Sequence, residues 1–248
     1  MKPINSVAVA MLLSLGIVAC SGNGSSNAAE NHAAPTPPAI NENGNTEQAG
    51  STEWIKNAID NPDYIHLNAT NETIVLQNIN DKKTIPTTYS DILLEYPPSK
   101  SIEIGGRPKS GKHLDTNHVA LDATYTGKLY FADKTQKNKI KIRPVIFKLQ
   151  GQHISGHSVK NIEDDLQVIF EKTAINKQKL AEQGKIVDVL GFNANFKATK
   201  EKKDFDKGGY LGYFAGPKAE EVVGELRGTE HIDGAFVAEK QAIPLTKP

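Results

Sequence analysis

Hydrophobic and polar residues alternate along most of the second half of the chain. Between residues 119 and 131, and again between 166 and 170, apolar side chains occupy every other position. This period of two is the signature of a β-strand that buries one face. Similar runs complete a predicted set of eight strands, at residues 140–149, 153–158, 187–198, 210–214, 221–227 and 232–240. The pattern therefore predicts a mainly β domain.

Eight antiparallel strands of this length commonly close into a barrel whose interior is filled by side chains. A two-sheet sandwich is the alternative arrangement of the same strands. The apolar positions change parity across Pro144, which predicts a bulge or bend there. Residues 173–183 lack alternation and end before Gly184, so we expect a surface helix with a glycine end.

The region before these strands has a different pattern. Short apolar runs at 74–76 and 92–94 are interrupted by prolines, and residues 105–112, rich in Gly, Pro and Lys, predict a loop. Ser51 or Thr52 would cap a short helix that runs to Ile59, before Pro62. We expect residues 52–117 to form a small α+β handle domain in front of a C-terminal eight-stranded antiparallel β-barrel, residues 118–248.

The N-terminus carries a secretory signal. Lys2 precedes an apolar run at residues 7–18, which is too short for a permanent membrane span of roughly 20 residues. The run ends in Ile17-Val18-Ala19-Cys20, which resembles the lipobox of bacterial lipoproteins. The resemblance implies that residues 1–19 are a signal peptide and that Cys20 is the site of lipid attachment. Cys20 is the only cysteine, so no intramolecular disulfide can form.

Residues 20–51 are rich in Ser, Gly, Asn and Pro and contain almost no large apolar side chains. Such a segment cannot bury enough surface to offset the entropy of ordering. We expect a disordered, lipidated tether that typically holds the folded part some ~30 Å from the anchor.

Composition and motifs exclude several classes of function. Lys plus Arg and Asp plus Glu both number 29, so no net charge favours nucleic acid as a partner. No nucleophile elbow, zinc-protease motif or phosphate loop is present, so we expect no enzymatic activity.

The last third of the chain carries a longer motif. Its pattern, G-x-F-x-G-P-x-A-x-E-x-x-G, is formed by Gly212, Phe214, Gly216, Pro217, Glu221 and Gly224. This motif is similar to the closing strands of a group of Gram-negative surface lipoproteins that includes transferrin-binding protein B, factor H binding protein and hemophilin-like proteins. The chain is long enough for one handle and one barrel only.

The resemblance implies a lipid-anchored protein of the outer membrane, exposed at the cell surface after export by the surface lipoprotein assembly modulator. It further implies a host ligand. The first hypothesis is iron acquisition from haem, haemoglobin or a transferrin-type carrier, with delivery to a TonB-dependent receptor. The second is complement evasion by binding factor H or another serum protein, and the third is a structural or adhesive role.

Histidines are the candidate haem ligands. His113 and His118 flank the expected junction of handle and barrel, where Ile102, Ile104 and Leu114 could line an apolar slot. Ordinary surface histidines are the alternative. His153 and His157 share one face of a strand but lie about 13 Å apart, too far to hold one metal. We expect these two to face solvent.

Two groups of residues are candidates for protein binding. One is a basic run through the first barrel hairpin, consisting of Lys134, Lys137, Lys139, Lys141 and Arg143. The other is a set of handle tyrosines, Tyr64, Tyr89 and Tyr96, because tyrosine is a good interface anchor. A solvated strand face and core packing are the respective alternatives.

Overall fold

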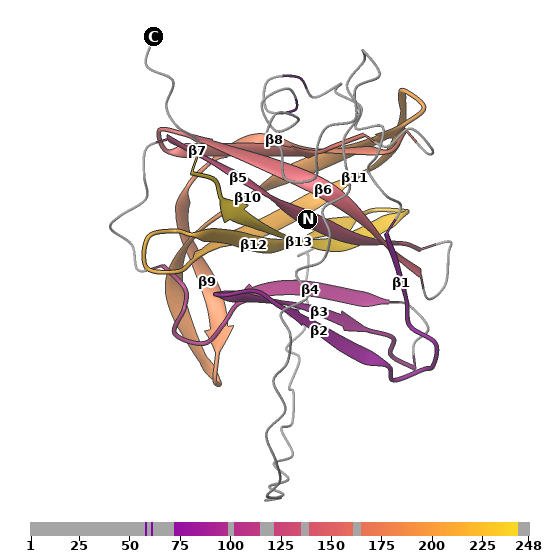
Figure 1. Ribbon diagram of the computed structural model, residues 1–248, viewed down its shortest axis with the longest axis horizontal. Coiled ribbons are helices and arrows are strands. Elements are labelled where there is room, and N and C mark those ends of the chain that lie inside the picture. The colour runs from indigo at the N-terminus through magenta and orange to yellow at the C-terminus, as the bar shows by residue number, and fades with distance from the viewer. Residues whose placement is uncertain are drawn as a thin grey trace, which may run out of the picture. The chain divides into compact units, whose positions relative to one another are not determined.

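A computed structural model describes residues 58, 61, 72–98, 102–114, 122–134, 139–160 and 165–242 (Figure 1). All of them belong to one unit of the chain, Pro35–Pro248. The expected signal peptide, Cys20 and the tether lie outside the described residues. Of the expected helix at 52–59, only Ala58 is described, and it is helical.

Eight antiparallel strands close into a barrel, as the alternation predicts. Their order around the wall is β6-β5-β13-β12-β11-β10-β8-β7, and pairing of β6 with β7 completes the circle. The strands are β5 (Asp122–Asp133), β6 (Lys139–Gln150), β7 (His153–Ser158), β8 (Gln167–Ala174), β10 (Lys185–Lys200), β11 (Lys203–Ala215), β12 (Glu221–Gly228) and β13 (Ile232–Lys240). Closure leaves the barrel strands without open edges.

Two further strands extend this wall. β1 (Thr73–Val75) pairs with the start of β6, and β9 (Asn176–Glu182) pairs with the first half of β10. The helix expected at residues 173–183 is therefore wrong. Leu180 pairs with Val187 and is buried, and the positive φ angles of Gln183 and Gly184 form the tight turn between the strands. Tertiary burial of Leu180 outweighs the helical propensity of its polar neighbours.

The barrel interior is filled by aromatic side chains. Phe147 lies at its centre, with ring centroids 4.9 Å from Phe170 and 4.8 Å from Phe236. The Tyr125 hydroxyl donates to the Ala219 carbonyl at 3.0 Å, which satisfies a buried polar group. Burial, followed by the charge of Glu220, raises the pKa of Tyr125. The fully buried aromatic residues of this interior are Tyr125, Phe131, Phe147, Phe170, Phe192, Phe196, Phe214 and Phe236.

Pro144 does not interrupt β6. The register of β5 and β6 continues across the Pro144–Lys128 pair without a shift, so the expected bulge is wrong. The apolar residues of β6 change from one strand face to the other because the two ends of the strand pack against different cores. Ile140 and Ile142 point outward into a second core, whereas Val145 and the residues that alternate with it point into the barrel.

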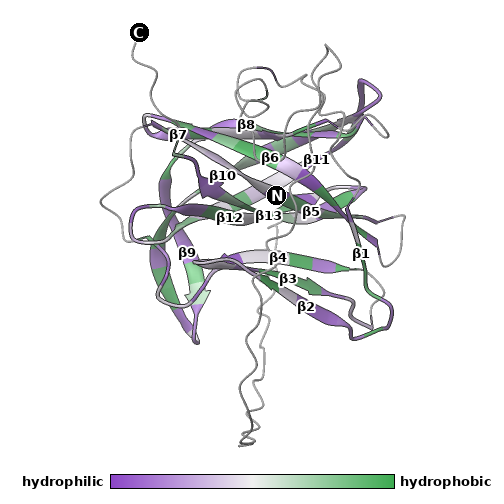
Figure 2. Ribbon diagram, in the orientation of Figure 1, coloured by the Kyte–Doolittle hydropathy of each residue, from purple (hydrophilic) through white to green (hydrophobic). Residues whose placement is uncertain are grey.

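The second core lies between the barrel and a three-stranded sheet, β2 (Lys82–Pro86), β3 (Ser90–Glu95) and β4 (Glu103–Pro108). Ile92, Leu94 and Ile104 are buried against barrel residues that include Tyr213 and Val223. Green apolar segments line this layer in Figure 2. The loop expected at 105–112 is correct only after Pro108, because β4 pairs with β3 up to that residue. The described residues of the expected handle thus contribute this small sheet and β1, which joins the barrel wall.

Candidate binding surfaces

Glu221 joins the barrel to the three-stranded sheet. Its carboxylate is buried, with 1% of the residue exposed, and it accepts hydrogen bonds from the Thr87 hydroxyl at 2.7 Å and the Tyr89 N–H at 3.1 Å. Thr87 and Tyr89 belong to the turn between β2 and β3. Glu221 was singled out as a motif residue, and the structure gives it the role of a clamp. Two neutral donors bonded to one carboxylate make a strong, directional contact.

The other motif residues shape the wall and the turn beside this clamp. Phe214 fills the interior, and a side chain at Gly212 would lie 2.3 Å from the Phe192 ring. Gly216 has a φ of 84°, which favours glycine, and a side chain there would press on Tyr89. Pro217 occupies the same exposed turn, and Gly224 faces Gly212 across β11 and β12. These residues form the structural core of the junction.

His113 contacts a carboxylate at the other side of the junction. It forms a bridge with Ala215, and its Nδ1 lies 3.4 Å from the Glu182 carboxylate. Hydrogen bonds from the Ser110 hydroxyl and the Gly111 N–H, together with the charge of His113, lower the pKa of Glu182. Glu182 thereby ties the end of β9 to the connection between β4 and the barrel. His118, the partner of His113 in the expected haem pair, lies outside the described residues.

The residues expected to line a haem slot do not share one space. Ile102 and Ile104 are buried in the core between sheet and barrel, whereas Leu114 packs in the barrel interior. The slot expected from these three side chains is therefore wrong, because each already contributes to a packed core.

The β9–β10 hairpin forms an arm. Its inner face carries Leu180 and Val189, which are buried in the core of the three-stranded sheet. Its outer face carries Ile186, which is 73% exposed, next to an ion pair of Lys179 and Asp188. Ile186 is the most exposed large apolar side chain among the described residues. A single exposed aliphatic side chain is common on protein surfaces, so Ile186 by itself does not mark a binding site.

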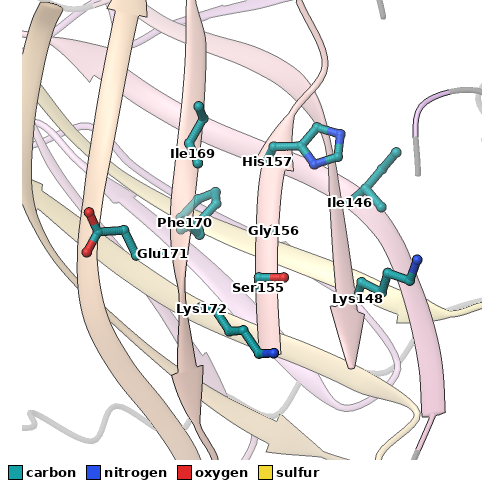
Figure 3. A pocket seen from close by; sticks show the side chains of 9 residues that line it. All are labelled: Ile146, Lys148, Ser155, Gly156, His157, Ile169, Phe170, Glu171 and Lys172. Carbon is teal, nitrogen blue, oxygen red and sulfur yellow. The ribbon is translucent and has the colours of Figure 1, made fainter. Parts of the chain in front are cut away.

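The outer wall of β6, β7 and β8 contains a hollow with a volume of about 310 Å³. Figure 3 shows His157 at one end, between β7 and Ile146. His157 is only 8% exposed and its Nε2 lies 2.8 Å from the Ala58 carbonyl, so the expectation that it faces solvent is wrong. Ala58 covers it by packing against Ile146 and Val159. His153 is exposed as expected.

The basic run does not form one surface. Arg143 is 1% exposed and points into the barrel, where its guanidinium lies 5.9 Å from the Phe131 ring centroid, so it cannot join an exposed patch. Lys139 is exposed, Lys141 is half-buried, and Lys137 lies outside the described residues. Lys139, Lys141 and Arg143 alternate along β6 and therefore share one strand face, but this face becomes buried in the barrel by the position of Arg143.

The expected tyrosine set is also dispersed. Tyr89 is half-buried at the Glu221 clamp, Tyr96 packs on the core of the three-stranded sheet, and Tyr64 lies outside the described residues. Sequence reasoning missed Glu182, Ile186 and the hollow. Only Ile186 had a detectable signal, since it is out of phase with the alternating Val187 and Val189.

Among the described residues, no group of three His, Cys, Asp or Glu side chains could hold a metal ion. Over the same part of the chain, no helix combines the length and apolar character needed to cross a bilayer.

Comparisons with known proteins give solved structures of low similarity. No family model and no curated protein matches the sequence. HpuA from Kingella denitrificans in complex with human haemoglobin aligns with 69% of this chain and 62% of its own chain, at 11% identity and a TM-score of 0.45. The chain thus spans less than two thirds of that protein's length.

Two more solved structures are similar to this chain at a comparable level. The apo haemoglobin receptor HpuA from the same organism aligns with 83% of this chain and 77% of its own, at 11% identity and a TM-score of 0.47. Transferrin binding protein B from Actinobacillus pleuropneumoniae aligns with 84% of this chain and 98% of its own, at 15% identity and a TM-score of 0.36. At these identities and TM-scores, the similarity says nothing about function.

Proposed function

We propose that this chain is a lipid-anchored surface protein of the outer membrane that binds a host iron carrier, such as haemoglobin or a transferrin-type protein. Two sequence features support this function. The segment ending at Cys20 resembles a lipobox, and the motif from Gly212 to Gly224 resembles surface lipoproteins that capture host ligands. Among proteins of similar fold, HpuA is described as a haemoglobin receptor, and another is named for transferrin.

The filled barrel interior is the observation that carries the choice of a macromolecular partner. Phe147, Phe170 and Phe236 occupy the centre of the barrel in mutual contact. A ligand-binding barrel keeps its interior open, whereas this interior is packed like a protein core. Recognition therefore takes place on the outer surface, where the three-stranded sheet and the arm with Ile186 offer area for a protein.

Affinity capture tests the proposal. The mature chain with Cys20→Ser serves as soluble bait in host serum and in erythrocyte lysate, and the eluate is analysed by mass spectrometry and absorbance. We expect haemoglobin or a transferrin-type carrier. Capture of factor H alone would support complement evasion instead, and no captured protein would favour a structural or adhesive lipoprotein. Mass spectrometry of the native N-terminus checks acylation of Cys20 separately.

Haem itself is the small-ligand form of the same proposal, with His113 and His118 as ligands. Mixing the mature chain with haem should then give an intense Soret band that is lost in His113→Ala and His118→Ala. Retention of the band in both variants would remove these residues as ligands. Delivery to a TonB-dependent receptor and export by the surface lipoprotein assembly modulator belong to the same proposal.

A further inference from the structure

The imidazole of His157 lies beneath a residue from a distant part of the chain. His157 belongs to β7, on the outer wall of the barrel (Figure 3), and Ala58 covers it. Ala58 is itself buried, because it packs against Ile146 and Val159 on the same wall. One polar contact and a small apolar cluster therefore dock the chain at Ala58 on the barrel.

The polar contact has a defined direction. The His157 Nε2 lies 2.8 Å from the Ala58 carbonyl oxygen. A carbonyl oxygen can only accept, so Nε2 carries a proton and donates it. A second proton would have to bind Nδ1, and it would place a full positive charge on a ring that is largely removed from water. The docked state therefore favours the neutral imidazole.

Charged groups on the neighbouring strands do not compensate a positive imidazole. Lys148 of β6 and Lys172 of β8 line the same hollow and carry the same sign of charge. Glu171 of β8 is the one carboxylate among the described lining residues, and it forms an ion pair with Lys197 at 3.3 Å. The nearest titratable residues in the sequence of the docked segment are Lys56 and Asp60.

We propose that His157 is an acid-sensitive latch, which holds the chain at Ala58 on the barrel wall at neutral pH and releases it in acid. The chain is attached to the wall again at Glu72, whose carbonyl accepts a hydrogen bond from the Ile142 N–H at 2.9 Å. Release at Ala58 would therefore lengthen the connection between this attachment and the expected tether. The latch does not depend on the identity of the host ligand.

The direction of the pH dependence follows from the burial of the ring. Burial lowers the pKa of His157 below its ordinary value of 6.5, and the hydrogen bond to Ala58 opposes this only in part. The released imidazole therefore takes up a proton at a higher pH than the docked imidazole. Docking is fully favourable above a pH of about 6.5, and it weakens as the pH falls from there toward the lowered pKa.

Hydrogen exchange measured by mass spectrometry tests the latch on the complete mature chain with Cys20→Ser. The peptide that contains Ala58 should lose protection at least about threefold between about pH 7.5 and about pH 5.5, after correction for the intrinsic exchange rate. Peptides from β6 and β7 should stay protected, because the barrel remains folded. Equal protection of the Ala58 peptide at both pH values, or a parallel loss in the barrel, would overturn the proposal.

Substitutions assign the response to His157. His157→Gln keeps a side-chain N–H donor but does not titrate, so the Ala58 peptide should stay protected at both pH values. His153→Gln is the matched control, because His153 is exposed on the same strand and its loss should leave the response unchanged. A response that persists in His157→Gln, or that disappears in His153→Gln, would reject the latch.

An NMR titration of His157 gives a readout that does not require glutamine to fit beneath Ala58. Ala58→Arg should displace the chain from the wall, so the pKa of His157 should rise toward 6.5. Val75→Arg, at an exposed position of β1, is the control and should leave this pKa unchanged. An equal pKa of His157 in wild type and Ala58→Arg would show that Ala58 does not cover the ring, and would overturn the proposal.

Discussion

The two faces of the barrel wall are held in different ways. The inner face packs aromatic rings around Phe147, together with polar groups such as the Tyr125 hydroxyl and the Arg143 guanidinium. The outer face packs aliphatic residues of the three-stranded sheet and fixes that sheet with one buried carboxylate, Glu221. The aromatic contacts of the inner face are non-directional, whereas the hydrogen bonds of Glu221 fix the orientation of the three-stranded sheet on the outer face.

Removal of the Phe147 ring from the centre of the barrel should produce the largest loss of stability. Phe147→Ala creates a cavity between Phe170 and Phe236, and we expect the free energy of unfolding to fall by about 3–5 kcal/mol. Urea denaturation followed by circular dichroism measures the change. A loss below about 1 kcal/mol would show that the interior can collapse around the gap and is not tightly packed.

Glu221→Gln tests the polar contact of the outer face. The amide keeps the size of the side chain but loses the charge that binds Thr87 and Tyr89, so we expect a loss of about 1.5–3 kcal/mol. A double-mutant cycle with Thr87→Val isolates the pair. Hydrogen exchange should rise in β2 and β3 more than in the barrel. Uniform exchange across both regions would mean that Glu221 does not act as a clamp.

The contribution of the Asp206 carboxylate to the stability of the protein should depend on pH. Burial alone would raise its pKa, but hydrogen bonds from the backbone N–H groups of His231, Ile232, Lys207 and Glu230 lower it overall. A lowered folded-state pKa means that this carboxylate stabilises the protein above its unfolded pKa of about 3.9, and that the stabilisation is lost as the pH falls through the folded value.

Asp206→Asn should therefore lower the free energy of unfolding at pH 7 by about 1–3 kcal/mol and reduce its decline between neutral and acidic pH. Urea titrations at a series of pH values measure both quantities. Asp91, a half-buried carboxylate of β3, provides the control as Asp91→Asn. If wild type and Asp206→Asn lose stability in parallel on acidification, the N–H contacts do not hold Asp206 ionised.

The smallest effect on stability is expected at the arm. Ile186→Asp changes an exposed side chain, so the free energy of unfolding should change by no more than about 0.5 kcal/mol. Capture of the host protein should nevertheless fall if the arm is a contact surface. The same assay with Val75→Asp, another exposed aliphatic residue, serves for comparison. Undiminished capture by Ile186→Asp would exclude the arm from the interface.

The barrel could be predicted because its signal is local. Alternation along β5 and β8 reports which face each residue presents, and eight such runs in succession favour closure. The helix expected at 173–183 failed because Leu180 is the one strongly informative residue of β9, and the cover that buries it is supplied by a distant sheet.

The surroundings of the candidate site residues depend on contacts between distant parts of the chain, and no local sequence pattern records such contacts. His157 is covered by Ala58, about a hundred residues earlier in the chain, and Arg143 lies on the inner face because of the strand register. Glu221 could be singled out from its motif, but its partners Thr87 and Tyr89 lie in another sheet. Side-chain environments that depend on such long-range contacts can be described only from the three-dimensional structure.

The pairing of β13 with β5 has a consequence for the order of assembly. Ile232 pairs with Asp133 and Lys240 with Tyr125, so about a hundred residues separate the strands that meet there. The circle cannot be completed until the last strand is available, and pairing over such a sequence distance is slow. A chain that emerges N-terminus first therefore leaves the circle open until almost all of its residues are available.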